Sequence, residues 1–187
     1  SMAVAVAVGG IFFWGACSAM AEKPQPGKQT GMTFSKKVTK ELSLDYLLFL
    51  PESYSPQSDK QWPVIVFLHG LGERGDRMSD LERVKIHGPA MLVEKDPKFE
   101  FIVVSPQCKG DSWWTFNLEE LNAMLDHVLD TVKNIDRNRV YLTGLSMGGF
   151  GSYRWALHDP ERFAAVAPIC GGGEYQPVWA LPAAKQA

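Results

Sequence analysis

The sequence predicts an α/β domain with a mostly parallel sheet. Four short apolar segments have the composition of buried strands, and each ends at or near Gly, Ser or Pro. Segments with helical periodicity lie between them, and strand–helix alternation is typical of a parallel sheet with right-handed crossovers. Functional groups of such a sheet are expected at the carboxyl ends of its strands. The four segments are residues 62–70, 101–107, 139–146 and 163–173.

Composition indicates one soluble globular domain. The chain has 187 residues, of which 45% are hydrophobic and 21% are charged, as is usual for globular domains. Its 19 basic and 21 acidic residues are mixed along the sequence and give a net charge of -2. Because there is no basic stripe, nucleic acid is not an expected partner.

Residues 1–21 contain no charged residue and end near Ala19-Met20-Ala21. An apolar run with a small-x-small end is typical of a signal peptide, which predicts a secreted or periplasmic protein. A lipoprotein signal ending at Cys17 and a helix that belongs to the fold remain as alternatives. The lipoprotein is less favoured, because the usual Leu three places before the Cys is absent. Residues 22–37 are predicted to be a flexible leader, and residues 38–187 the domain.

Two segments with alternating apolar residues open the domain. Residues 38–44 and 46–54 predict an antiparallel pair of strands. Residues 64–68 are continuously apolar, which suits a strand covered by helices on both faces. The segments at residues 101–107, 139–146 and 163–173 are predicted to be strands covered on both faces in the same way.

Helices are predicted at residues 89–95, 117–136 and 147–158. Asn117 with Glu120 three residues later resembles a capping box. The middle helix has the clearest pattern, because its apolar residues recur at spacings of three and four along one face. These residues are Leu118, Leu121, Met124, Leu125, Val128, Leu129 and Val132.

The segment Gly144-Leu145-Ser146-Met147-Gly148 matches the pattern G-x-S-x-G. It follows a predicted strand and precedes a predicted helix, which is the context of a nucleophile elbow. There the serine lies on a sharp, strained turn, and the glycines lack the Cβ atoms that would collide as strand and helix approach. The pattern therefore predicts a nucleophilic serine. The alternative is a Gly-rich turn with a capping serine.

With this motif and two others, the chain resembles the α/β-hydrolase family, and within it the secreted carboxylesterases, feruloyl esterases and polyhydroxyalkanoate depolymerases. The resemblance covers residues 38–173. It is carried by HGLGERGD, by SPQC followed by SWW, and by GLSMGGFGSYRWALHDPERFAAVAPICGGG, in that order. It implies a three-layer sandwich with the last strands and helix of the family missing from this sequence.

The resemblance also implies roles for single residues. Ser146 would attack an ester carbonyl while the backbone N–H groups of Leu71 and Met147 hold the oxyanion. One of Trp113 and Trp114 would line the substrate pocket. No metal and no organic cofactor are expected.

Further residues of the HGLGERGD segment have structural roles by the same resemblance. His69 would support the oxyanion loop rather than act as a base. Glu73, Arg74 and Asp76 are expected to stabilise the loop as a charge cluster, and binding of a substrate carboxylate by Arg74 is the alternative.

The acid and the histidine of a catalytic triad are not present in the sequence at suitable positions. In this fold the order is Ser, then Asp or Glu, then His, and only His158 follows the serine. It lies twelve residues along the same predicted helix, roughly 18 Å away. His87 and His127 precede the serine, and Glu174 has no histidine after it. We therefore expect a C-terminally incomplete hydrolase, with a naturally short pseudoenzyme as the alternative.

Two structural expectations follow. The strand at residues 163–173 would form an exposed sheet edge that invites self-association. The family's strand order would separate the strands leading to Cys108 and Cys170 by about 14 Å, whereas a disulfide needs Cα atoms within about 7 Å.

The predicted function is serine carboxylic-ester hydrolysis through an acyl-enzyme. Short-chain esters or acyl groups on plant polysaccharides are the expected substrates. The alternative is a catalytically inactive fragment or pseudoenzyme that acts as a binding module. A serine peptidase of the same fold is less favoured, because there is no room for a substrate-gating domain.

Overall fold

The computed structural model describes residues 26, 29 and 32–172. The chain divides into two units, Ser1–Lys40 and Glu41–Ala187. The described residues of the first unit form neither helix nor strand and are exposed. The predictions for residues 1–21, for Cys17 and for Glu174 lie outside the described residues.

The second unit is built on a sheet of five strands. β2 (Trp62–Leu68), β3 (Ile102–Pro106), β4 (Ile135–Leu145) and β5 (Ala165–Ile169) are parallel, and β1 (Tyr46–Phe49) is antiparallel to β3. The strand order is β1-β3-β2-β4-β5. This confirms the mostly parallel sheet.

The prediction of an opening antiparallel pair is wrong. Residues 38–44 form no strand, and β1 pairs with β3, with Tyr46 opposite Pro106 and Phe49 opposite Val103. A hairpin needs a loop of at least two residues, and only Asp45 separates the two predicted strands. β1 therefore finds its partner far along the chain.

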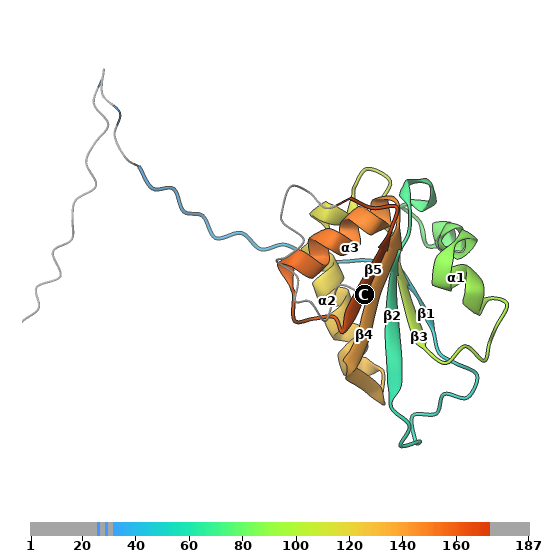
Figure 1. The fold of residues 1–187 in the computed structure, drawn as a ribbon. Coiled ribbons are helices and arrows are strands. Elements are labelled where there is room, and N and C mark those ends of the chain that lie inside the picture. The colour runs from blue at the N-terminus through green and yellow to red at the C-terminus, as the bar shows by residue number, and fades with distance from the viewer. Residues whose placement is uncertain (1–25, 27–28, 30–31, 173–187) are drawn as a thin grey trace, which may run out of the picture. The chain divides into compact units, whose positions relative to one another are not determined.

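The helices form layers on both sides of the sheet. In Figure 1, α2 (Leu118–Thr131) and α3 (Met147–His158) lie on one side, and α1 (Gly88–Val93) lies on the other. This is the three-layer arrangement that the sequence predicts. Short 3-10 helices occupy the connections at Leu71–Glu73 (η1), Met78–Ile86 (η2) and Trp114–Phe116 (η3).

α2 begins as expected but ends earlier. The predicted stripe faces the core, where Leu121, Leu125 and Val128 are fully buried. The helix ends at Thr131 because Val132 is extended, with ψ 119°, and Asn134 then adopts a positive φ of 60°. The chain turns there, and Ile135 then pairs with Trp62 as the start of β4.

The predicted capping box at α2 is also wrong. Asn117 is the N-cap residue, but its side chain makes no cap hydrogen bond. Its Oδ1 accepts a hydrogen bond from Ser112 Oγ at 2.7 Å instead. The amide is thus used to hold the loop that precedes the helix.

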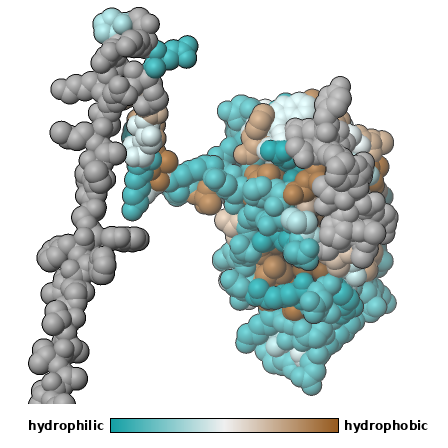
Figure 2. Space-filling view, turned by 60° about the vertical axis from the view of Figure 1, so that its left-hand side comes forward, coloured by the Kyte–Doolittle hydropathy of each residue, from teal (hydrophilic) through white to brown (hydrophobic). Residues whose placement is uncertain are grey.

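The main core lies between the sheet and the α2–α3 layer. Trp155 of α3 packs edge-on against Phe163 with ring centroids 5.0 Å apart, and its Nε1 donates to Asn122 Oδ1 of α2 at 2.7 Å. These contacts join the two helices. Figure 2 shows that the lower end of the domain, where β2 begins, is almost uniformly hydrophilic, whereas apolar patches occur above it.

The other face of the sheet is partly open beside β5. Residues of β2, β4 and β5 line an apolar hollow of about 440 Å³ there, including Ile65, Tyr141, Thr143, Ala165 and Ala167. Among the described residues no helix covers this part, so the expectation that every strand is covered on both faces is wrong for β5. Among the strands of residues 32–172, β5 lies at one edge of the sheet.

Cys108 is buried and Cys170 is exposed, and both are free thiols. They follow β3 and β5, which are separated by two strands. Burial raises the pKa of the Cys108 thiol to about 12, so this thiol stays protonated at neutral pH. Within residues 32–172 there is no helix long and apolar enough to cross a membrane.

Candidate active site

Ser146 occupies the turn between β4 and α3. Its backbone has φ 53° and ψ -113°, a conformation that L-residues rarely adopt and that costs on the order of 1–3 kcal/mol. The backbone N–H of Ser146 donates to Ile169 O at 2.8 Å, which fixes the turn to the end of β5. The residue is exposed, so its hydroxyl group can reach a substrate.

Two glycines make this turn possible. A Cβ at Gly148 would lie 1.8 Å from Leu68 O, and a Cβ at Gly144 would lie 2.3 Å from Gly148 O. No side chain fits at such distances. The glycines thus allow α3 to begin directly against the ends of β2 and β4, as the G-x-S-x-G pattern predicts.

The two residues predicted to hold an oxyanion each begin a helix. Met147 is the first residue of α3 and is 2% exposed. The first N–H groups of a helix have no partner within the helix and carry partial positive charge. Leu71 is the first residue of η1, which follows β2, and the residue is 44% exposed.

His69 joins residues 69–76, which we call the oxyanion loop after the role predicted for the Leu71 N–H, to the loop that follows β3. Its Nε2 accepts a hydrogen bond from the Cys108 N–H at 3.0 Å, so the proton lies on Nδ1, which donates to Gly70 O at 2.6 Å. Both ring nitrogens are therefore engaged. Burial lowers the pKa of His69 below the usual 6.5, and the ring is neutral in the folded protein at neutral pH.

The two tryptophans of the SWW segment differ in position. Trp114 is fully buried, and its Nε1 donates to His69 O at 2.9 Å. Its ring also meets the His69 ring edge-on at 4.9 Å between centroids. Trp113 is 42% exposed. Of the two, only Trp113 is exposed and could contact a substrate. Trp114 packs in the core and supports the oxyanion loop through its hydrogen bond to His69 O.

The three charged residues of the oxyanion loop do not form one cluster. Arg74 donates to Leu71 O at 3.2 Å and to Ser112 O at 3.1 Å. Asp76 Oδ1 accepts from the Gly110 N–H at 3.0 Å, and Glu73 Oε1 lies 3.7 Å from His87 Nε2. Arg74 and Asp76 reach the loop that follows β3, whereas Glu73 lies beside His87. Arg74 is engaged with backbone carbonyl groups, which favours its role in the loop over binding of a substrate carboxylate.

None of the four histidines is placed to act as the base for Ser146. His69 has both nitrogens engaged, and His158 ends α3, twelve residues or roughly 18 Å from the serine. His87 pairs with Glu73, and His127 is an exposed residue of α2. A base must reach its serine at about 3 Å.

Sequence reasoning missed one residue of this region. Gln107 is buried, and its Nε2 donates to Glu73 O of the oxyanion loop. A glutamine directly after an apolar strand carries no periodic signal. Its position in the SPQC segment, at the carboxyl end of β3, could have indicated it.

The burial of His69 predicts a pH-dependent stability. Below pH 6.5 the unfolded chain binds a proton at His69 that the folded chain does not, so the free energy of unfolding should fall as the pH drops from 7 to 5. His69→Asn should be less stable by about 1–3 kcal/mol at pH 7 and should lose part of this slope. Urea unfolding at several pH values measures both.

Asp80 and Asp136 also have lowered pKa values, but both titrate below the usual 3.8. They therefore do not contribute to a change of stability between pH 7 and pH 5. Equal slopes in the wild type and in His69→Asn would contradict the prediction.

Comparison with known proteins shows the same family. Residues 41–180 match the family described as "Putative esterase". The chain is 31% identical over 158 residues to the probable feruloyl esterase C of Aspergillus terreus, with 83% of this chain and 56% of that protein covered. It is 28% identical over 131 residues to the bifunctional acetylxylan esterase/xylanase XynS20E of Neocallimastix patriciarum, with 68% and 18% covered.

A solved structure of a thermostable esterase is similar in both sequence and fold. It has 34% sequence identity and a TM-score of 0.58, with 73% of this chain and 40% of that chain covered. The chain spans about half the length of the feruloyl esterases that it matches. Since the family match extends over most of the sequence and the fold agrees, the chain belongs to the esterase family of the α/β-hydrolases.

Proposed function

We propose that Ser146 is the nucleophile of a carboxylic-ester hydrolase that acts through an acyl-enzyme. The observation that carries this proposal is the positive φ of an exposed serine between β4 and α3. A strained backbone persists only where surrounding contacts impose it. Here those contacts are the glycines on either side and the hydrogen bond to Ile169 O.

The oxyanion would be held by the backbone N–H groups of Leu71 and Met147. As Ser146 attacks, negative charge develops on the carbonyl oxygen, and fixed donors aimed at it contribute about 3 kcal/mol each. The N-terminus of α3 adds its partial positive charge at Met147. His69 and Trp114 are positioning residues, because their hydrogen bonds hold the loop that carries Leu71.

Short-chain or carbohydrate-linked acyl esters are the proposed substrates. The names of the relatives, feruloyl esterase and acetylxylan esterase, support this class. Trp113 is the candidate for contact with the substrate, because it is exposed at the carboxyl end of β3. Phe150 is also 41% exposed and lies one helical turn after Ser146.

The described residues supply no histidine as the base. Loss of the base from a serine triad lowers turnover by a factor on the order of 10⁶. We therefore propose that residues 1–187 carry the nucleophile and oxyanion half of the site and need a base from elsewhere. The alternative remains an inactive fragment or pseudoenzyme that acts as a binding module.

Imidazole provides a test, because it can supply a base in solution. The purified chain should hydrolyse an alkyl acetate or methyl ferulate at a background rate. Added imidazole should raise this rate in the wild type and not in Ser146→Ala, and Trp113→Ala should raise KM in the same assay. Ser79→Ala, which changes an exposed serine of η2, is the matched control.

Equal responses of the wild type and Ser146→Ala to imidazole would overturn the nucleophile and favour the binding module. A rate typical of esterases without imidazole, abolished by Ser146→Ala, would overturn the missing base and keep the nucleophile.

We also propose that the edge of β5, which pairs with no other described strand on its outer side, pairs with a second copy of the chain. Ile169 is 51% exposed on this edge, and the apolar hollow lies beside it. Pro168 has no N–H, which limits but does not abolish backbone pairing. Sedimentation velocity should show dimers that Ala167→Lys dissociates. A wild-type monomer at about 100 µM, a concentration far above the Kd of a stable dimer, would exclude this interface.

Export is a further proposal and rests on the uncharged residues 1–21. Sequencing of the protein recovered outside the cytoplasm should show Glu22 as its first residue. Protein that keeps residues 1–21 and stays in the cytoplasm would refute the signal peptide.

A further inference from the structure

A row of apolar residues on α3 begins one turn after Ser146. Phe150, Tyr153 and Leu157 follow one another at spacings of three and four, so they lie on the same side of the helix. Phe150 is exposed, and the other two are partly exposed. From Ser146 to Leu157 the helix extends over roughly 16 Å. The row therefore leads from the proposed nucleophile along the outer side of the domain.

η3 lies beside this row and adds to it. A Cβ at Gly151 would lie 2.4 Å from Trp114 Cβ, so η3 rests directly on α3. Phe116, the last residue of η3, is 77% exposed. Apolar groups gathered on a surface are typical of a binding site. We call the following residues the α3 face: Thr115, Phe116, Phe150, Tyr153, Arg154 and Leu157.

The α3 face is shallow. Its central hollow, which all of its residues except Phe116 line, has a volume of about 20 Å³, room for about one water. A protein partner anchors itself with large side chains that fill pockets, and this hollow is too small for one. A flat molecule can instead lie across the face. Such a molecule would meet both rings and hydrogen-bond donors, because Thr115, Tyr153 and Arg154 carry donor groups.

Sugar rings combine the properties that this face requires. Their faces consist of polarised C–H groups, which the negative face of an aromatic ring attracts. Their hydroxyl groups lie around the edge of the ring and need hydrogen-bond partners. A sugar chain therefore matches a surface on which aromatic rings alternate with donors.

We propose that the α3 face binds the sugar chain of a carbohydrate-linked ester. Phe116 and Tyr153 stack on the sugar rings, and Thr115 and Arg154 donate to their hydroxyl groups. The ester lies at Ser146, and the chain extends from it along α3. This assignment rests on the proposed function, because it places the part of the substrate that does not react.

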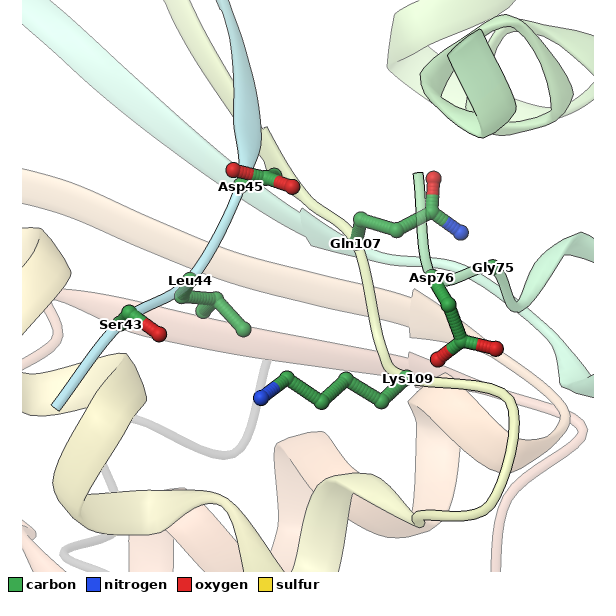
Figure 3. Close-up of a pocket in the computed structure, with 7 residues that line it drawn as sticks. All are labelled: Ser43, Leu44, Asp45, Gly75, Asp76, Gln107 and Lys109. Carbon is green, nitrogen blue, oxygen red and sulfur yellow. The ribbon is translucent and has the colours of Figure 1, made fainter. Parts of the chain in front are cut away.

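A second hollow near the oxyanion loop differs in its lining. It lies where the residues before β1, the Gly75–Asp76 turn and the loop after β3 meet, and Figure 3 shows that no aromatic side chain lines it. Its side chains are mostly polar, and Lys109 extends along one side. A sugar ring would find no stacking partner there. Lys109 therefore offers a control position outside the α3 face.

NMR titration of the isotope-labelled chain with xylohexaose, an unesterified linear oligosaccharide, tests the α3 face without requiring catalysis. Amide signals of η3 and α3 should shift saturably. Phe116→Ala should weaken binding about three- to tenfold, because it removes one stacking ring. Phe116→Tyr should bind as the wild type does. Phe116→Leu should bind as weakly as Phe116→Ala, because leucine keeps apolar surface but has no ring.

The matched control is Phe34→Ala, the same change at an exposed phenylalanine of the first unit. Phe34→Ala, Lys109→Ala and Ser146→Ala should all bind the oligosaccharide as the wild type does. The absence of saturable shifts, or wild-type affinity in Phe116→Leu, would overturn the sugar site. So would sedimentation velocity in which Phe116→Ala dissociates a dimer while oligosaccharide binding is unchanged.

Failure of the α3 face and failure of the proposed function give different results, because the oligosaccharide carries no ester. Binding that persists while imidazole acts equally on the wild type and Ser146→Ala would overturn the nucleophile and keep the sugar site. A response to imidazole that requires Ser146, without oligosaccharide binding, would overturn the sugar site and keep the nucleophile.

Discussion

The close approach of α3 to the ends of β2 and β4 is the constraint on which the rest of the site depends. A Cβ at Gly148 would overlap Leu68 O, so only glycine lets the helix begin this close to the sheet. The chain must then reverse within one residue, and Ser146 takes the positive φ that this requires. Its strain, about 1–3 kcal/mol, is offset by the burial of α3, in which Met147 and Trp155 are almost fully enclosed.

A second set of contacts makes the oxyanion loop a tertiary feature rather than a local one. The loop follows β2, but hydrogen bonds of His69 and Arg74 hold it to residues that follow β3. Gln107, which also follows β3, donates to Glu73 O of the loop. Trp114 closes the arrangement by donating to His69 O. Because burial lowers the pKa of His69 below the usual 6.5, the ring is neutral at neutral pH and both of its hydrogen bonds are made there. The loop after β3 therefore helps to hold the segment that carries the Leu71 N–H.

The two faces of the sheet contribute differently to the protein. One face carries α2 and α3 and holds the main core, whereas the other exposes an apolar hollow beside β5. The elbow depends only on β2, β4, β5 and α3, which all lie within residues 32–172. The strained turn at Ser146 is therefore held in place by contacts among these four elements. A base and its acid partner need elements beyond those four.

The sequence by itself determined the parallel strand segments, both ends of α3 and the serine on a strained turn. Apolar runs, glycine spacing and a Pro after the helix are local signals, and they act within a few residues. Only the tertiary structure decided that β1 pairs with β3, that α2 ends at Thr131, that Trp114 is core while Trp113 is exposed, and that Gln107 donates to Glu73 O. The reason is physical: strand partners, burial and cavities depend on contacts between residues far apart in the chain, which no local pattern records.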